Sequence, residues 1–87
     1  MRVKENYVLK EVADTYIVVP IGSGNVDFNT LVTLNETGAF IWKALEHETT
    51  KEEILEEMLS EYDVPRDVAA ADIDAFIAKV QSAGLLV

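Results

Sequence analysis

The chain contains no cysteine among its 87 residues. Disulfide bridges, thiolate metal cages and cysteine nucleophiles are therefore excluded. A chain of this length buries a modest share of its surface, so its hydrophobic core must hold it together without covalent help and with marginal stability. The absence of cysteine is compatible with the cytoplasm, where thiols stay reduced.

Long hydrophobic runs are absent as well. The apolar stretch from Tyr16 to Ile21 is far shorter than the roughly 20 residues of a membrane-spanning helix, and a turn cluster over residues 22–25 ends it. No hydrophobic segment of a signal peptide follows the charged N-terminal residues. We therefore expect a cytoplasmic protein without a membrane partner. No linker is long enough to separate two domains, so residues 1–87 are expected to form one.

Positive charge is scarce. Seven Lys and Arg stand against 16 Asp and Glu, which gives a formal net charge of −9. Affinity for nucleic acids depends largely on cations that neutralise phosphates. Because Lys51, Arg66 and Lys79 are isolated among carboxylates, no nucleic-acid partner is expected.

The first third of the sequence predicts three strands. Tyr7 to Val12 alternates with period two, and Thr15 to Ile21 is rich in β-branched and aromatic residues, as strands are. Pro20 cannot donate a ladder hydrogen bond, which indicates a strand end or an edge position. Thr30 to Leu34 is the third strand. Tight loops between these segments predict an antiparallel meander.

From Asn35 onward the apolar residues follow a helical period. Asn35 is a suitable N-cap for a helix over residues 36–46. Gly38 inside this helix indicates a close packing contact, because glycine otherwise costs helix stability. Thr50 and Glu53 fit a capping box at the start of a second helix.

A third helix of about 18 residues is expected to begin at Pro65, a residue well suited to the first helical position. Gly84 is expected to end it in left-handed geometry, and residues 85–87 to form a short final strand or wing. The core-facing side chains of the three helices are predicted to be Ile41, Trp42, Leu45, Ile54, Leu55, Met58, Leu59, Tyr62, Ala69, Ile73, Phe76, Ile77 and Val80. The sequence thus predicts an α+β fold, a three-stranded antiparallel β-meander followed by three helices, similar to a winged helix-turn-helix.

Reactive side chains are too few to indicate catalysis. His47 is the one histidine, and its place beside Glu46 and Glu48 favours a solvated loop residue over a base or metal ligand. The glutamates of the second helix form one acidic face without the pattern of a calcium loop. No motif gives a serine a His or Lys partner. We predict that the protein is not an enzyme and needs no metal or cofactor.

The stretch from Leu34 to Gly38, followed by Ile41-Trp42 and Leu45, resembles the start of the helical half of the PqqD family. The resemblance continues through Thr50, Glu53-Ile54, Leu59, Tyr62, Val68, Asp72-Ile73, Phe76-Ile77 and the run from Ala83 to Leu86. It covers essentially the whole chain in order and spacing. It implies a RiPP recognition element, a non-catalytic peptide chaperone that binds the leader of a ribosomally synthesised precursor peptide. Such domains present the peptide to a separate modifying enzyme, often a radical SAM enzyme, and the family takes its name from pyrroloquinoline quinone (PQQ) biosynthesis.

The resemblance also implies where the leader binds. In such domains the leader adds as a strand beside the third strand, in a groove against the third helix. The peptide-binding residues that this implies are Thr30, Leu31, Val32, Thr33 and Leu34 of the third strand and Val68, Asp72, Ala75 and Lys79 of the third helix. Backbone contacts are expected at residues 31–33. Val68 is apolar but lies outside the core stripe, so it either lines the groove or packs against the preceding loop.

Two other functions stay open at this point. A winged-helix DNA-binding regulator would need a basic recognition helix, whereas the third helix places Asp67, Asp72 and Asp74 beside Arg66 and Lys79. A structural subunit of a larger synthase would be distinguished only by its partners. An open strand edge would also permit a homodimer.

Overall fold

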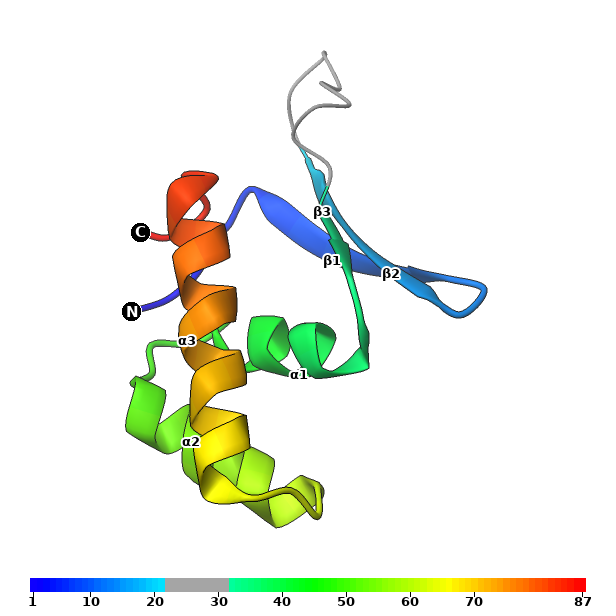
Figure 1. Ribbon diagram of the computed structural model, residues 1–87. Helices are drawn as coiled ribbons and strands as arrows, with labels where there is room; N and C mark the ends of the chain where they lie inside the picture. Colours follow the sequence, from blue (N-terminus) through cyan, green and yellow to red (C-terminus); the bar gives the residue numbers. More distant parts are fainter. Residues whose placement is uncertain (22–31) are drawn as a thin grey trace.

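The computed structural model describes residues 1–21 and 32–87. Within these residues three strands precede three helices (Figure 1). The elements are β1 (Tyr7–Val12), β2 (Thr15–Pro20), β3 (Val32–Leu34), α1 (Glu36–Ala44), α2 (Lys51–Glu61) and α3 (Arg66–Ser82). The predicted α+β order is therefore confirmed, with differences confined to the ends of elements.

The strands form one antiparallel sheet in the order β1-β2-β3. The turn Ala13-Asp14 joins β1 to β2, and Ala13 has a φ of 56°, as tight two-residue hairpins require. Pro20 ends β2, as predicted. In the described part of the chain β3 pairs with β2 only, so its other edge is open. Thr30 and Leu31, which were expected in this strand, lie outside the described residues.

The hydrogen bonds between β1 and β2 determine which way β2 directs its backbone groups. The amide of Ile21 donates to the carbonyl of Asn6 at 2.8 Å, so these two residues form a bonded pair. Bonded and non-bonded pairs alternate along antiparallel strands. The amide and carbonyl of Ile17, four residues before Ile21, are therefore directed toward β1. Tyr16 and Val18, its neighbours in β2, therefore direct their amides and carbonyls toward β3.

The start of α1 is as predicted, and its end comes earlier. The side chain of Asn35 accepts a hydrogen bond from the amide of Gly38 at 2.8 Å, the predicted N-cap. The helix ends at Ala44, and the next amides, of Glu46 and His47, donate to the carbonyls three residues back, of Lys43 at 3.2 Å and Ala44 at 3.5 Å. The carbonyl of Leu45, which the helix end leaves without an intrahelical partner, accepts from the amide of Val3 at 2.8 Å.

The starts of α2 and α3 correct two details. The hydroxyl of Thr50 accepts from the amide of Glu53 at 3.2 Å, as predicted, but the Glu53 carboxylate accepts from the hydroxyl of Thr49 at 3.0 Å instead of completing the capping box. The prediction that Pro65 is the first helical residue is wrong. Pro65 is the N-cap, with an extended ψ of 144°, and Arg66 begins the helix. The φ that the proline ring fixes suits either position.

The hydrophobic core lies between the helices and one face of the sheet. Its buried members are Val3, Val18, Leu34, Ile41, Trp42, Leu45, Ile54, Met58, Ala69, Ile73, Phe76, Ile77, Val80 and Leu85. The predicted core of α1 and α3 is therefore confirmed. Leu55, Leu59 and Tyr62 of the predicted set are half-buried and pack at the margin of this core.

The two ends of the chain meet beside α3 (Figure 1). Gly84 follows α3 with a φ of 74°, as predicted, and turns the chain so that Leu85 is buried in the core. Val3 and Leu86 then form an isolated antiparallel bridge. The expected final strand is thus a single bridge, and its partner is the N-terminal segment.

Candidate functional site

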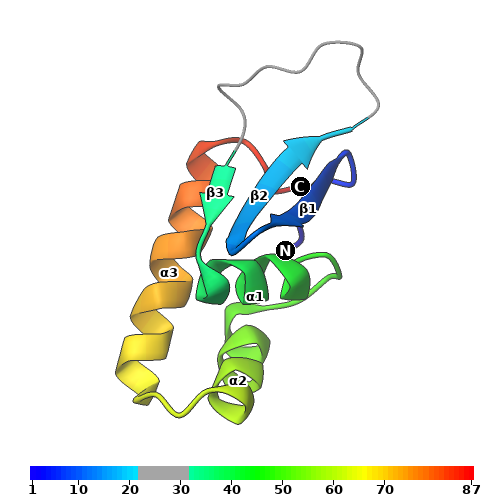
Figure 2. The same cartoon turned by 90° about the vertical axis from the view of Figure 1, so that its right-hand side faces the viewer.

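A groove of about 610 Å³ separates β3 from α3. Figure 2 shows β3 facing α3 on one side and β2 on the other, with α1 following at the end of β3. The residues that line the groove are Asp14, Thr15, Thr33, Leu34, Asn35, Thr37, Gly38, Ile41, Asp72, Ala75, Phe76 and Lys79. The volume is that of a cleft able to take several side chains of a ligand.

The open edge of β3 offers backbone hydrogen bonds to this groove. Tyr16 and Val18 direct their backbone groups toward β3, where they are paired with Leu34 and Val32. Thr33 lies between these two residues, so its amide and carbonyl face the open edge. Among the described residues of β3, Thr33 is therefore the one that can bond an added strand. Val32, where a backbone contact was expected, bonds β2 instead.

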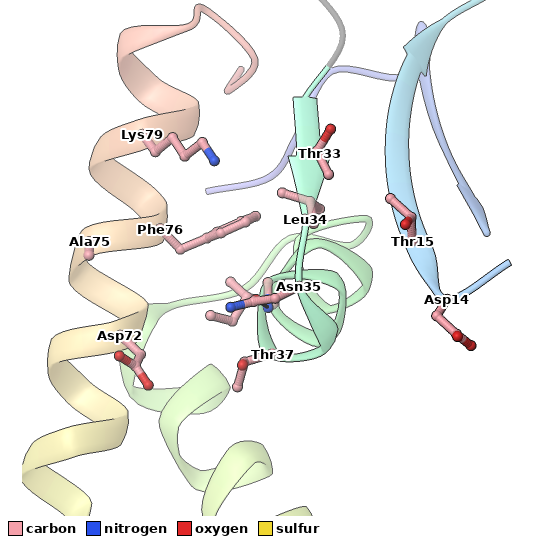
Figure 3. A pocket seen from close by; sticks show the side chains of 12 residues that line it. Asp14, Thr15, Thr33, Leu34, Asn35, Thr37, Asp72, Ala75, Phe76 and Lys79 are labelled. Carbon is pink, nitrogen blue, oxygen red and sulfur yellow. Dashed lines mark hydrogen bonds between the residues drawn. The ribbon is translucent and has the colours of Figure 1, made fainter. Parts of the chain in front are cut away.

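The floor of the groove is apolar. Figure 3 shows the ring of Phe76 reaching from α3 toward Leu34. Gly38 makes room for this ring, since a Cβ atom there would lie 3.3 Å from Cε2 of Phe76 and 3.4 Å from Cβ of Leu34. The close packing predicted at Gly38 is thereby confirmed. Ile41 completes the floor from α1.

Charged residues lie at the two ends of the groove. Lys79 lies near the start of β3, whereas Asp72 lies toward the start of α1, with Asp14 on the far side (Figure 3). All three are exposed, and none has an ion-pair partner within residues 1–21 and 32–87. Asp74 of the same helix, by contrast, pairs with Lys51 of α2 at 3.1 Å.

The structure brings most of the expected site together. The expected residues that line the groove are Thr33, Leu34, Asp72, Ala75 and Lys79. Val32 is half-buried against the core, while Thr30 and Leu31 lie outside the described residues. Val68 precedes Asp72 by one helical turn, is 47% exposed and does not line the groove. Both interpretations of Val68 remain predictions.

Several lining residues were not foreseen as part of a site. Asp14 and Thr15 come from the β1–β2 hairpin and Thr37 from the first turn of α1. Phe76 of α3 was expected only in the core, and it lines the groove as well. Strand patterns on both sides of residues 13–14 indicate a tight hairpin there. Its arrival at the groove depends on the register of β2 with β3, in which Tyr16 is paired with Leu34, and no local pattern reports that register.

Other titratable groups lie outside the groove. His47 is exposed after α1, as predicted. The ammonium group of Met1 donates to Oε1 of Glu48 at 2.6 Å and lowers the pKa of Glu48. In the described ranges, no three His, Cys, Asp or Glu side chains gather as they would around a metal ion. No helix in these ranges has the length and hydropathy to cross a membrane.

Comparison with known proteins identifies one family and two similar structures. The family model described as Coenzyme PQQ synthesis protein D (PqqD) matches residues 15–86. The structure of TbiB1 in complex with the TbiA(beta) leader peptide is similar with a TM-score of 0.74 and 24% identity, over 99% of this chain and 94% of that one. A lasso peptide synthetase B1 complexed with the leader peptide gives a TM-score of 0.71 and 23% identity, over 97% and 93%. No curated protein matches the sequence. At these identities the two structures support the fold.

Proposed function

The chain belongs to the PqqD family, and on this premise we propose that it is a non-catalytic chaperone for a precursor peptide. It binds the leader of a ribosomally synthesised peptide and presents that peptide to a separate modifying enzyme. The observation that carries this proposal is the open edge of β3 beside an apolar groove. A strand edge supplies backbone hydrogen bonds and a groove supplies specificity. The similar structures of TbiB1 and of lasso peptide synthetase B1 each hold a leader peptide.

In the proposed complex the leader lies along β3 as a fourth strand. The Thr33 amide donates to one leader residue, and the Thr33 carbonyl accepts from that same residue. The leader residues on either side of it direct their side chains to the core face of the sheet. There they meet Leu34 and Phe76, while the exposed side chains of Asp72, Ala75 and Lys79 form the wall opposite.

The same open edge would serve a homodimer. If two copies paired through β3, each copy would occupy the backbone amide and carbonyl of Thr33 in the other, which are the groups that the leader needs. Leader capture and this kind of dimer are therefore mutually exclusive.

The charges of α3 do not support the DNA-binding alternative. Asp67, Asp72 and Asp74 are all exposed on this helix. Arg66, one of its two cations, is paired with Glu56 at 3.0 Å. A recognition helix of this composition would repel phosphates. We propose that the partner is a peptide-modifying enzyme, of the radical SAM class that the family resemblance suggests.

An amide chemical-shift titration tests the proposed function. The ligand is the leader of a precursor peptide encoded beside this gene. We expect micromolar or tighter binding, worth about −8 kcal/mol, with shifts concentrated in β3 and in residues 72–79 of α3. The amides of α2 serve as the internal control, because that helix does not line the groove. No shift at millimolar leader, or shifts centred on α2, would contradict the proposal.

A further inference from the structure

The two ends of the groove carry opposite charge. Lys79 forms the basic end, beside the start of β3, and Asp72 forms the acidic end, toward the start of α1, whereas Asp14 lies across β3 on the hairpin side (Figure 3). Phe76 lies on α3 between Asp72 and Lys79. None of the three charged side chains is used by an ion pair in the described residues. Each is exposed and lines the groove, where a bound ligand would meet it.

The spacing of these charges matches the repeat of a strand. Asp72 and Lys79 are about 10 Å apart along the axis of α3. Alternate residues of a strand share one face, and three such residues span about 13 Å. The difference between these two lengths is about 3 Å, which the long side chains of charged residues can span. Three successive groove-facing residues of a ligand can thus meet the acidic end, the apolar floor and the basic end.

The direction of β3 relates this charge pattern to the direction of the ligand. β3 runs from the basic end toward the acidic end, because Val32 precedes Leu34 and α1 follows. Both strand pairs of the sheet are antiparallel, and antiparallel pairing is the more common and slightly more stable kind. An antiparallel added strand therefore runs from the acidic end to the basic end.

The register of the added strand follows from the backbone amide and carbonyl of Thr33, which face the open edge. The ligand residue opposite Thr33 has its side chain on the outer face of the sheet, as Thr33 itself does. The preceding ligand residue, opposite Leu34, faces the floor at Phe76. Its groove-facing neighbours lie two positions before it, toward Asp72, and two positions after it, toward Lys79.

On the proposed function, we infer that the groove selects both the direction and the composition of the captured strand. It favours a segment with a basic residue, an apolar residue two positions later and an acidic residue two positions after that. A strand inserted in the reverse direction would bring like charges together at both ends.

Selection from a displayed library of random dodecapeptides tests this inference. The library is sorted against the wild-type protein and against the double variant Asp72→Lys/Lys79→Asp, which exchanges the charges at fixed net charge. Both side chains are exposed, so the exchange should leave the fold intact. The matched control is Lys51→Asp/Asp74→Lys, which exchanges an ion pair away from the groove. Thr33→Pro removes the edge amide and identifies peptides that bind at β3.

The expected result is an order of basic, apolar and acidic residues at alternate positions in the wild-type pool. The charge order should invert in the pool of the exchanged variant and stay unchanged with the control. Synthetic peptides from the wild-type pool should bind the exchanged variant about tenfold more weakly, since two exposed ion pairs turn from attraction to repulsion. Added salt should narrow this difference.

Two other results would overturn the inference, and they differ in what they say of the proposed function. Peptides that depend on Thr33 but show no charge order, the reverse order, or the same order with both proteins would remove the charge-based selection and leave strand capture standing. Pools with no peptide that depends on Thr33 would contradict strand capture itself.

Discussion

The ring of Phe76 lies over Gly38, so that a Cβ atom at Gly38 would approach Cε2 of Phe76 to 3.3 Å and Oδ1 of Asn35 to 3.1 Å. Gly38→Val should therefore displace both the groove floor and the helix cap, at a cost of about 1–3 kcal/mol in the free energy of unfolding. Gly38→Ala is the control, because a gain of about 1 kcal/mol in helix propensity offsets its smaller crowding. Urea denaturation measures both. A Gly38→Val protein as stable as the wild type would contradict this packing.

Gly84 turns the chain after α3 with a φ of 74°, and among residues 1–21 and 32–87 no atom beyond its own chain neighbours lies within 4 Å of a Cβ atom built there. Gly84→Ala should cost about 1–2 kcal/mol for backbone strain alone, since there is nothing for the methyl group to strike. Gly84→Asn should keep more of the stability, because asparagine tolerates left-handed geometry. Equal stability of the two variants in chemical denaturation would contradict the left-handed backbone geometry at residue 84.

Local signals predicted the parts of the fold that depend on neighbouring residues. Asn35 caps α1, Thr50 caps α2 and Gly84 follows α3, because each of these motifs involves contacts within a few residues. Pro65 was misplaced by one position, since its ring fixes φ and leaves ψ to decide between the cap and the first helical residue.

Contacts between distant segments could not be predicted in the same way. The carbonyl of Leu45 after α1 accepts from the amide of Val3, and the final segment pairs through Leu86 with Val3. For the groove, helical spacing alone groups Asp72 with Lys79 on one face of α3. Asp14 reaches the same groove only through the register of β2 with β3, so its part in the site was missed.

Glu48 should make stability depend on pH in the acid range. Its hydrogen bond and ion pair with the Met1 ammonium lower the pKa of Glu48 below the ordinary 4.5. The resulting stabilisation is fully present above that value and is lost as the pH falls through the lowered folded-state pKa. Glu48→Gln should thus melt below the wild type at neutral pH, and the difference should close in acid.

Thermal melts of both proteins between neutral pH and about pH 3 measure this difference. Glu46→Gln, at an exposed neighbouring position, is the control and should leave the melting temperature nearly unchanged. A difference between Glu48→Gln and the wild type that persists at the acid end would contradict the account.

Thr33→Pro should weaken leader binding while leaving the fold intact. Proline removes an amide that faces the open edge and is not needed by β2, and edge strands tolerate this change. Loss of one hydrogen bond and obstruction by the ring should lower the affinity about tenfold. Thr33→Val keeps the amide and should bind as the wild type does. Calorimetric titration that finds the two variants equal would argue against backbone pairing at this residue.

Amide hydrogen exchange at Thr33, measured with and without saturating leader, tests strand capture most directly. In the free protein the Thr33 amide faces the open edge and should exchange quickly, whereas the amides of Val32 and Leu34 are bonded to β2 and should already be protected. Bound leader should slow the exchange of Thr33 by at least about tenfold, as one added hydrogen bond allows. Unchanged exchange of Thr33 at saturation would show that the leader binds elsewhere and would contradict capture along β3.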